Sequence, residues 1–350
     1  MISNSAFDVV IVGGGLAGLT TALDLSRLNI SILVIEKYEY PHHKVCGEYI
    51  SNEVLSYLKE LGIDPFNRGA KAISKFEMST KDGGLIEAKL PLGGFGISRY
   101  TIDYAMYEAL KNKVEVLFDT VIDVVFNHDL FQINTQSKAI FSAKYVVGAY
   151  GKRSNLDLQF QRSFLKSRSP WLGVKAHFEY DFPEDLVALH NFEGGYCGLS
   201  KVETGAVNAC YLTTFKSFKP VSDIERFQNT IMSKNPYLKD FFRKAKPLFK
   251  KPLAISQFSF EAKEPVFEHI FMIGDSAGLI HPLCGNGMAM AIHSAKLFSE
   301  IFSEAIQGDM QNRATLEELY MTQWNRTFMN RLKSGRRIQS LLLNLSLIHI

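Results

Sequence analysis

Three glycines near the N-terminus have the spacing of a phosphate-binding turn. Gly13, Gly15 and Gly18 follow the apolar run DVVIV in the pattern G-x-G-x-x-G. The first glycine of such a pattern permits a tight turn, the second lets the backbone approach a pyrophosphate, and the third lets a helix pack closely on a strand. The phosphates would lie at the start of that helix, where the unpaired N–H groups of Leu16 and Ala17 favour an anion.

A glutamate lies where the ribose of the nucleotide is expected. Glu36 ends a second buried run, ISILVIE, and its carboxylate can accept hydrogen bonds from ribose hydroxyls. The negative charge disfavours a 2′-phosphate, so NADP is not expected at this site. Lys37 follows directly and joins the nucleotide-binding candidates. A glycine-rich structural turn is the alternative for the motif alone, but the strand, the helix and the acidic residue together predict a dinucleotide site.

A second glycine-rich segment, FMIGDSAGLIHPLCGNGMAMAI, begins at Phe271 with a predicted strand. Asp275 at the strand end could accept hydrogen bonds from a polyol chain. The Gly-Asn-Gly turn at 285–287 opens an apolar helix, and the N–H groups at a helix start stabilise a group that becomes negative. A reduced flavin carries such charge at its N1/C2=O edge. A glycine-rich helix cap over the core is the alternative interpretation.

The segment HHKVCGEYIS begins at His42 and contains residue types that could bind a metal or do redox chemistry. The spacing of His42, His43 and Cys46 matches no common zinc pattern, so no metal is expected and the histidines are interpreted as solvated loop residues. Cys46 lies in the loop that leaves the second strand, at the edge where open α/β sheets bind ligands. Ten extended residues span up to about 33 Å, so the loop could bring Cys46 and Gly47 to a flavin. Cys46 is then expected to be a proton donor or a substrate-positioning thiol, and an inert residue of a cavity wall is the alternative.

Composition limits the classes of protein. The 350 residues carry a net charge of +3 and 46% of them are hydrophobic, which is ordinary for a globular protein and unlike a nucleic-acid scaffold. No run approaches the roughly 20 apolar residues of a membrane span, and the first residues lack the pattern of a secretory signal. The cysteines lie far apart with no CxxC pair, so reduced thiols in a cytoplasmic protein are expected.

The order of the predicted elements indicates an α/β fold. A β-α-β unit begins the chain, helices are predicted over 52–61 and 101–111, and short strands separated by EGG and ETG over 173–215 are typical of an antiparallel sheet. A strand over 270–274 precedes a long helix from Met288, and helical patterning continues to the end. This order predicts a Rossmann-like nucleotide-binding domain with an inserted antiparallel-sheet domain and C-terminal helices.

These segments also resemble a known superfamily. The glycine fingerprint, GISRYTIDYAM and GDSAGLIHPLCGNGMAMAI together resemble the FAD-dependent superfamily of p-hydroxybenzoate hydroxylase, and KVCGEYIS resembles the Cys-Gly segment of geranylgeranyl reductase-like enzymes. The resemblance implies bound FAD, with Arg99 supporting the cofactor, the backbone of Val121 meeting adenine and Asp275 taking the ribityl chain. The cofactor-binding residues expected in this way are Gly13, Gly15, Leu16, Ala17, Gly18, Glu36, Lys37, Gly47, Arg99, Val121, Gly274, Asp275, Gly285, Asn286, Gly287 and Met288.

The expected domains are discontinuous. The FAD-binding domain is expected over 1–75, 98–160 and 262–300, the substrate domain over 76–97 and 161–261, and a C-terminal helical segment over 301–350. No acidic residue follows Glu318, whereas basic residues precede the apolar end LLLNLSLIHI, so the C-terminus could rest on an anionic membrane. A tail docked on the protein, or a helix cut short, is the alternative.

Two departures from the superfamily pattern bear on the reaction. Relatives that take hydride from NAD(P)H commonly have Gly-Ala-Asp-Gly where this chain has Tyr150 in the third position. Direct reduction by a nicotinamide is therefore in doubt, and a reduced flavin or a ferredoxin becomes an alternative donor to NAD(P)H. The segment GYCGLS at 195–200, with Tyr196 as the substrate-binding candidate, matches the aromatic-rich motif of prenyl reductases only loosely and lacks the tryptophan motif of flavin-dependent halogenases.

The expected function is that of an FAD-dependent oxidoreductase acting on a hydrophobic small molecule, such as an isoprenoid, a lipid or a polyketide-like compound. The Cys46-Gly47 segment favours reduction or desaturation of a carbon–carbon bond by hydride exchange at flavin N5, and the superfamily at large favours hydroxylation of an aromatic substrate. A flavin-less binding protein of the same fold and a nicotinamide-only dehydrogenase are further alternatives. An electron-donor protein is an expected partner, and nucleic acid is not.

Overall fold

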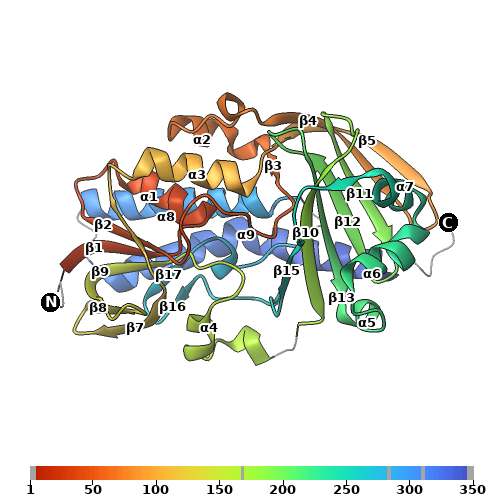
Figure 1. Cartoon of the computed structure of the whole chain (residues 1–350). Coiled ribbons are helices and arrows are strands. Elements are labelled where there is room, and N and C mark those ends of the chain that lie inside the picture. The colour runs from red at the N-terminus through yellow and green to blue at the C-terminus, as the bar shows by residue number, and fades with distance from the viewer. Residues whose placement is uncertain (1–4, 167–168, 282–284, 309–311, 345–350) are drawn as a thin grey trace.

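The computed structural model describes residues 5–166, 169–281, 285–308 and 312–344 (Figure 1). The described chain forms two β-sheets in adjoining halves of the molecule, with the helices packed around them. The first sheet lies in the half that contains the N-terminus, and the second contains the strands coloured green in Figure 1.

The first sheet has a parallel centre. Its strands are β1 (Ser5–Val12), β2 (Ile32–Glu36), β6 (Glu115–Phe118), β7 (Val121–Asn127), β8 (Leu130–Thr135), β9 (Ile140–Gly148), β16 (Val266–Phe267) and β17 (Ile270–Met272). The spatial order is β16-β17-β9-β1-β2-β6, and the strands from β17 to β6 are parallel. The antiparallel hairpin of β7 and β8 joins this sheet at β9. The carboxyl ends of β1, β2, β9 and β17 therefore meet at one edge, where sheets of this kind bind ligands.

Helices enclose the parallel strands. The long ones are α1 (Leu16–Leu25), α3 (Arg99–Leu110), α8 (Gly287–Gln307) and α9 (Arg313–Asn344). Figure 1 shows α1, α3 and α8 together over one face of the sheet, and α8 also contacts α9. Val9, Val10 and Ile11 of β1 are fully buried, because a parallel strand covered on both faces favours a continuous apolar run.

The second sheet is mostly antiparallel. Its strands are β3 (Tyr49–Ser51), β4 (Lys71–Ser79), β5 (Leu85–Gly96), β10 (Trp171–Glu179), β11 (Leu186–Phe192), β12 (Gly195–Lys201), β13 (Val207–Thr214), β14 (Lys246–Pro247) and β15 (Leu253–Ser256). The order is β14-β10-β13-β12-β11-β4-β5-β3, with β15 beside β10, and the pair of β11 and β4 is parallel.

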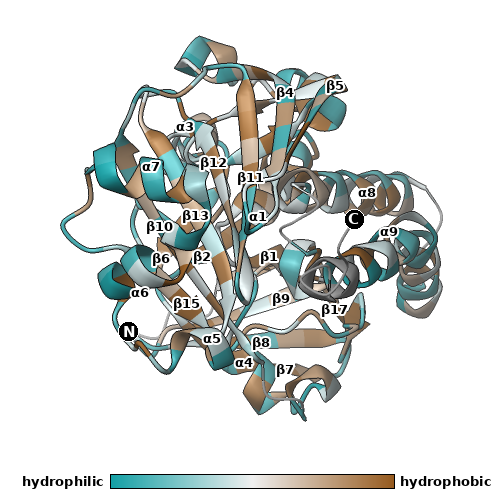
Figure 2. Ribbon diagram, turned by 90° about the vertical axis from the view of Figure 1, so that its right-hand side faces the viewer, coloured by the Kyte–Doolittle hydropathy of each residue, from teal (hydrophilic) through white to brown (hydrophobic). Residues whose placement is uncertain are grey.

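Short helices complete the molecule. They are α2 (Leu55–Glu60), α4 (Asn155–Gln159), α5 (Phe215–Phe218), α6 (Ile224–Thr230) and α7 (Pro236–Lys244). Figure 1 shows α5, α6 and α7 at the end of the second sheet away from the N-terminus. The side chain of Asn235 accepts hydrogen bonds from the first N–H groups of α7, whose Leu238 and Phe241 are buried. In Figure 2 the outward-lying α6 and α7 carry hydrophilic segments.

The fold class agrees with the sequence analysis. The parallel sheet, the separate antiparallel sheet and the C-terminal helices are all present. The helix predicted over 52–61 is divided into a 3₁₀ turn (Asn52–Val54) and α2. Strands β3 and β4 begin within the first segment assigned to the FAD-binding domain but pair in the second sheet, and the predicted domain boundaries stay predictions.

The basic C-terminal helix is partly tied to the rest of the molecule. Arg331 lies 3.2 Å from the carboxylate of Glu53, and Arg336 donates to the carbonyl of Phe260 at 3.2 Å. Within the described residues, none of the helices has the length and apolarity that crossing a membrane requires. Residues 345–350 lie outside the described residues, so membrane contact through this end stays a prediction.

Candidate active site

The glycine-rich turn between β1 and α1 has two tightly packed positions and one open position. Gly13 has φ +108°, and a Cβ on Gly18 would lie 1.9 Å from the carbonyl oxygen of Gly13, so neither site tolerates a side chain. Gly15 is different, because the nearest atoms to a Cβ there are Arg99 Nη2 at 3.6 Å and Lys44 Nζ at 4.0 Å. The start of α1 at Leu16 therefore has an open approach beside two cations, as a pyrophosphate requires.

Glu36 ends β2 beside this turn. Its Oε2 accepts a hydrogen bond from the N–H of Gly14 at 2.7 Å, and its Oε1 accepts one from the N–H of Tyr38 at 3.2 Å. Lys37 is exposed, with its ammonium 5.1 Å from the centre of the Tyr38 ring. Val121 begins β7, two residues after Asp119, whose N–H donates to the Glu36 carbonyl at 2.9 Å. The predicted ribose and adenine residues thus lie around the carboxyl end of β2.

Arg99 and Lys44 form a charged cluster with Asp103. The Arg99 guanidinium donates twice to the Asp103 carboxylate, at 2.7 Å each, and Lys44 Nζ lies 3.4 Å from the same carboxylate. Burial raises the pKa of Asp103, but Arg99 and then Lys44 outweigh it and hold that pKa below its ordinary value. Arg99 was predicted from the sequence but Asp103 and Lys44 were not, and only Asp103 had a local signal, its i,i+4 spacing from Arg99 on one helix.

The second predicted motif lies at the end of β17. Gly274 has φ +57° and packs against Ala17 of α1, since a Cβ on Gly274 would lie 2.9 Å from that methyl group. Asp275 follows in a 3₁₀ turn (Gly274–Ser276), and its carbonyl accepts from Lys263 at 2.8 Å. Burial lowers the pKa of Lys263 to about 8. No local sequence pattern identifies this lysine.

The Gly-Asn-Gly turn leads into α8 at the same edge. Gly285 has φ +60° and Gly287 is the first residue of the helix, followed by Met288. The Asn286 Oδ1 is buried and lacks a hydrogen-bond partner among the described residues. Cys284, just before the turn, lies outside the described residues. An unpaired buried acceptor next to a helix start is consistent with a polar ligand group at this point.

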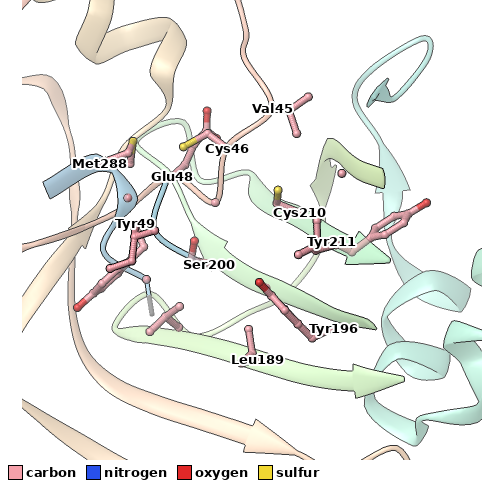
Figure 3. A pocket seen from close by; sticks show the side chains of 18 of the residues that line it. Val45, Cys46, Glu48, Tyr49, Leu189, Tyr196, Ser200, Cys210, Tyr211 and Met288 are labelled. Carbon is pink, nitrogen blue, oxygen red and sulfur yellow. The ribbon is translucent and has the colours of Figure 1, made fainter. Parts of the chain in front are cut away.

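A cavity of about 400 Å³ joins these motifs to the second sheet. The end of the cavity next to the first sheet is lined by Cys46, Gly47, Arg99, Asp275 and Met288. Figure 3 shows Cys46 on the loop beside Met288, across the cavity from the strands that carry Tyr196 and Cys210. The apolar side chains of the far end include Phe76, Leu90, Leu189, Leu212, Phe258 and Phe260. Catalytic, cofactor and substrate candidates from both sheets thus share one largely apolar space.

A buried ion pair lies directly behind Cys46 and Gly47. Glu48 and Lys175 are both fully buried and their side chains are in contact, while His177 Nε2 lies 2.6 Å from the other carboxylate oxygen of Glu48. Burial raises the pKa of Glu48, but the charge of Lys175 and the hydrogen bond of His177 hold it below its ordinary value. These three residues were not predicted as site residues, because nothing local identifies a partner 127 residues away.

The histidines of the HHKVCGEYIS segment do not behave alike. Both histidines, interpreted from sequence as solvated, are half-buried, and one ring nitrogen of His42 lies 2.8 Å from the carbonyl of Glu39. Burial together with Lys175 and His177 lowers the pKa of His43 to about 4. His43, Glu48 and His177 present potential ligand atoms within 4.8 Å of one another, so His43 groups with them and not with Cys46.

The site residues fit FAD in chemistry and space. Gly15 leaves an open approach beside two cations, and a Cβ on Gly47 would have no described protein atom within 4 Å. Tyr150, at the position where the superfamily resemblance implies an aspartate in nicotinamide-using enzymes, is half-buried and its hydroxyl lies 3.2 Å from Met272 Sδ. Tyr150 therefore packs at the end of β9, and it presents no carboxylate there.

Two protein families match parts of the chain. Residues 7–161 match the pyridine nucleotide-disulphide oxidoreductase family, and residues 229–334 match squalene epoxidase. Among curated proteins, the digeranylgeranylglycerophospholipid reductase of Methanocaldococcus jannaschii is 24% identical over 364 aligned positions, which cover 98% of this chain and 88% of that protein.

Solved structures share the fold. A geranylgeranyl bacteriochlorophyll reductase-like protein of Thermoplasma acidophilum superposes with a TM-score of 0.77 at 18% identity, covering 97% of this chain and 88% of that one. PqsL of Pseudomonas aeruginosa, a probable FAD-dependent monooxygenase, has a TM-score of 0.76 at 16% identity and 97% coverage of both chains. FAD-dependent halogenases share it as well. The resemblance to FAD-dependent oxidoreductases with geranylgeranyl reductase-like relatives is confirmed, and so is the expected fold.

Proposed function

We propose that this chain, an FAD-dependent oxidoreductase of the geranylgeranyl reductase-like type by its fold and relatives, exchanges a hydride with a carbon–carbon double bond of a hydrophobic small molecule. The observation that carries the proposal is the shared cavity, in which the cofactor residues at one end meet apolar side chains of the second sheet at the other. An apolar cavity with few polar groups orients a substrate by shape and desolvates the reacting atoms.

Residues at the carboxyl edge of the first sheet, on its strand ends, helices and loops, would hold the cofactor. Arg99, Lys44 and the start of α1 would bind the pyrophosphate, and Glu36 would accept from the ribose. Asp275 would accept from the ribityl chain, and the start of α8 would stabilise negative charge on the ring. FAD, when bound, supplies a site that donates or accepts hydride.

Residues around the cavity would handle the substrate and the proton. Reduction of a double bond adds a hydride to one carbon and a proton to the other, so a proton donor is needed beside the hydride site. Cys46 lines the cavity between the cofactor end and the second sheet, and its thiol is our candidate for that donor. Tyr196 of β12 lines the cavity and would orient the substrate.

An anaerobic product assay tests the reaction type. Chemically reduced FAD-loaded protein is mixed, without oxygen, with geranylgeraniol or an alkylphenol as probes, and the products are analysed by mass spectrometry. A product two hydrogens heavier supports reduction, and it should contain two deuterium atoms when the flavin is reduced and the reaction is run in D₂O, because the N5 hydrogen of a chemically reduced flavin also comes from the solvent. A product that forms only with oxygen and contains label from ¹⁸O₂ would assign hydroxylation instead.

Hydroxylation of an aromatic substrate is the second candidate. The match of residues 229–334 to squalene epoxidase and the fold shared with monooxygenases support oxygen insertion, and the aromatic substrate is the part of this candidate that comes from the superfamily resemblance. In either case we propose an electron donor other than direct NAD(P)H, because Tyr150 occupies the position of the aspartate found in nicotinamide-using relatives. Stopped-flow mixing with NADH, NADPH, reduced flavin and reduced ferredoxin would separate the donors.

A further inference from the structure

The carboxylate of Glu48 joins the two halves of the molecule. Its Oε1 accepts from the N–H of Arg99 at the start of α3 at 2.8 Å and contacts the ammonium of Lys175 on β10. Its Oε2 pairs with His177, also on β10. One buried side chain on the loop after β2 is thus held by α3 on the cofactor side and by a strand on the substrate side.

A side chain on the same face of the second sheet also holds the backbone of this loop. Asn208 of β13 is fully buried and donates to the carbonyls of Cys46 at 3.2 Å and Gly47 at 2.8 Å. In the strand pairing His177 lies opposite Asn208, so both side chains belong to one face of the sheet. From the cofactor side, Lys152 donates to the carbonyl of Val45 at 3.1 Å.

The conformation of Glu48 itself requires support. Its φ is +55°, a left-handed backbone conformation that is unfavourable for a residue other than glycine. A carboxylate buried without partners is also costly, and here each of its oxygens has a partner. The side-chain contacts therefore stabilise a backbone arrangement that directs Gly47 to open space, where its added Cβ would meet no described atom within 4 Å.

We infer that Glu48 is a positioning residue for the flavin, through which Lys175 and His177 hold Cys46 and Gly47 against the cofactor end of the cavity. This inference rests on the proposed function, because it assumes that FAD occupies that end. In this role Glu48, which also lines the cavity, acts through the loop and through Arg99. Its charge matters because Lys175 and Glu48 neutralise each other, so losing one leaves the other buried and unpaired.

FAD binding to variants tests the inference without any turnover assay. Glu48→Gln and Lys175→Met are expected each to weaken FAD binding at least tenfold, measured by quenching of FAD fluorescence. The double variant Glu48→Gln/Lys175→Met is expected to lose less FAD affinity than the product of the two single losses, because no unpaired charge remains. Glu193→Gln and Lys234→Met are the controls, since this pair is exposed, and they should change the affinity less than twofold.

The rate of Cys46 alkylation reports whether the loop lies against the bound flavin, and a loss of stability alone would not change its protection by saturating FAD. At FAD concentrations that saturate each variant, FAD is expected to protect Cys46 from iodoacetamide in the wild type and to protect it poorly in Glu48→Gln. If the charge variants do not fold, Asn208→Leu removes the donor to both loop carbonyls without changing charge and should show the same loss of protection.

Three results would overturn the inference. The first is FAD affinity within twofold of the wild type in both single variants, and the second is full protection of Cys46 in every variant. The third is binding of one Zn²⁺ per chain that is lost in both His43→Ala and Glu48→Gln, which would assign the cluster to a metal. If the wild type itself fails to bind FAD, the proposed function fails before this inference is tested.

Discussion

The Glu36 carboxylate accepts a hydrogen bond from the backbone N–H of Gly14 at 2.7 Å, which ties the carboxyl end of β2 to the glycine-rich turn after β1. Because β1 and β2 are adjacent parallel strands, their ends are in register, and this one contact fixes the turn relative to the expected ribose site. The turn is therefore shaped by the protein alone, which allows its structural and ligand-binding roles to be separated by mutation.

Gly15→Ala should leave the stability of the protein unchanged, whereas Gly18→Ala should destabilise it. A methyl group at Gly15 has its nearest neighbour at 3.6 Å and fits the protein, whereas one at Gly18 lies 1.9 Å from the Gly13 carbonyl. We expect Gly15→Ala to keep the melting temperature of the FAD-free protein but to weaken FAD binding at least about tenfold, since the methyl group occupies the phosphate approach. Gly18→Ala should instead prevent stable folding. Equal melting temperatures with unchanged FAD affinity in Gly15→Ala would show that no pyrophosphate binds there.

Cys46→Ala should slow the reaction without releasing the cofactor. If the thiol donates the proton, its loss should lower kcat at least about 100-fold at saturating substrate, with FAD content unchanged. Cys210→Ala is the matched comparison, because Cys210 lines the same cavity from the substrate sheet and should change KM more than kcat. Unchanged turnover of Cys46→Ala at saturating substrate would remove Cys46 from the proton-transfer step.

Arg99→Gln should destabilise the protein more at pH 7 than near pH 4. In the wild type Asp103 has a lowered pKa, so its contribution to stability is present above the unfolded-state pKa of about 4 and is lost as the pH falls below it. Without Arg99, burial dominates and the folded-state pKa rises above the unfolded value, with Lys44 as the remaining partner. The loss of unfolding free energy should then be about 3 kcal/mol at pH 7 and smaller near pH 4. Urea unfolding at both pH values measures it, and a loss independent of pH would contradict this assignment.

His281 should contribute to loss of stability in acid. It is buried and stacked on Phe260 at 3.8 Å between ring centres, and burial, with a smaller effect of Arg336, lowers its pKa to about 3. A depressed folded-state pKa means that its contribution is present above the unfolded value of about 6.5 and is lost as the pH falls from there towards 3, by up to about 1.4 kcal/mol per unit. His281→Phe should reduce this slope, and His128→Asn in an exposed turn should not. An identical slope in His281→Phe would be evidence against a neutral buried imidazole.

The fold and the cofactor motifs could be predicted because their signals are local. Gly13, Gly15 and Gly18 lie within one turn, and Glu36 is placed by the adjoining strand of the same β-α-β unit. The role of Glu48 could not be predicted, because its partners come from a strand more than 120 residues later. A lysine and a histidine on a sheet strand look like surface residues until the sheet packs against the loop.

FAD binding by the purified wild-type protein tests the central claim most directly. The protein is denatured, the released compound is identified by chromatography and mass spectrometry, and the FAD-free protein is titrated with FAD while fluorescence is recorded. We expect one FAD per chain, released on denaturation and rebound with saturation at one equivalent. Protein that releases no flavin and shows no saturable binding of added FAD would contradict the account.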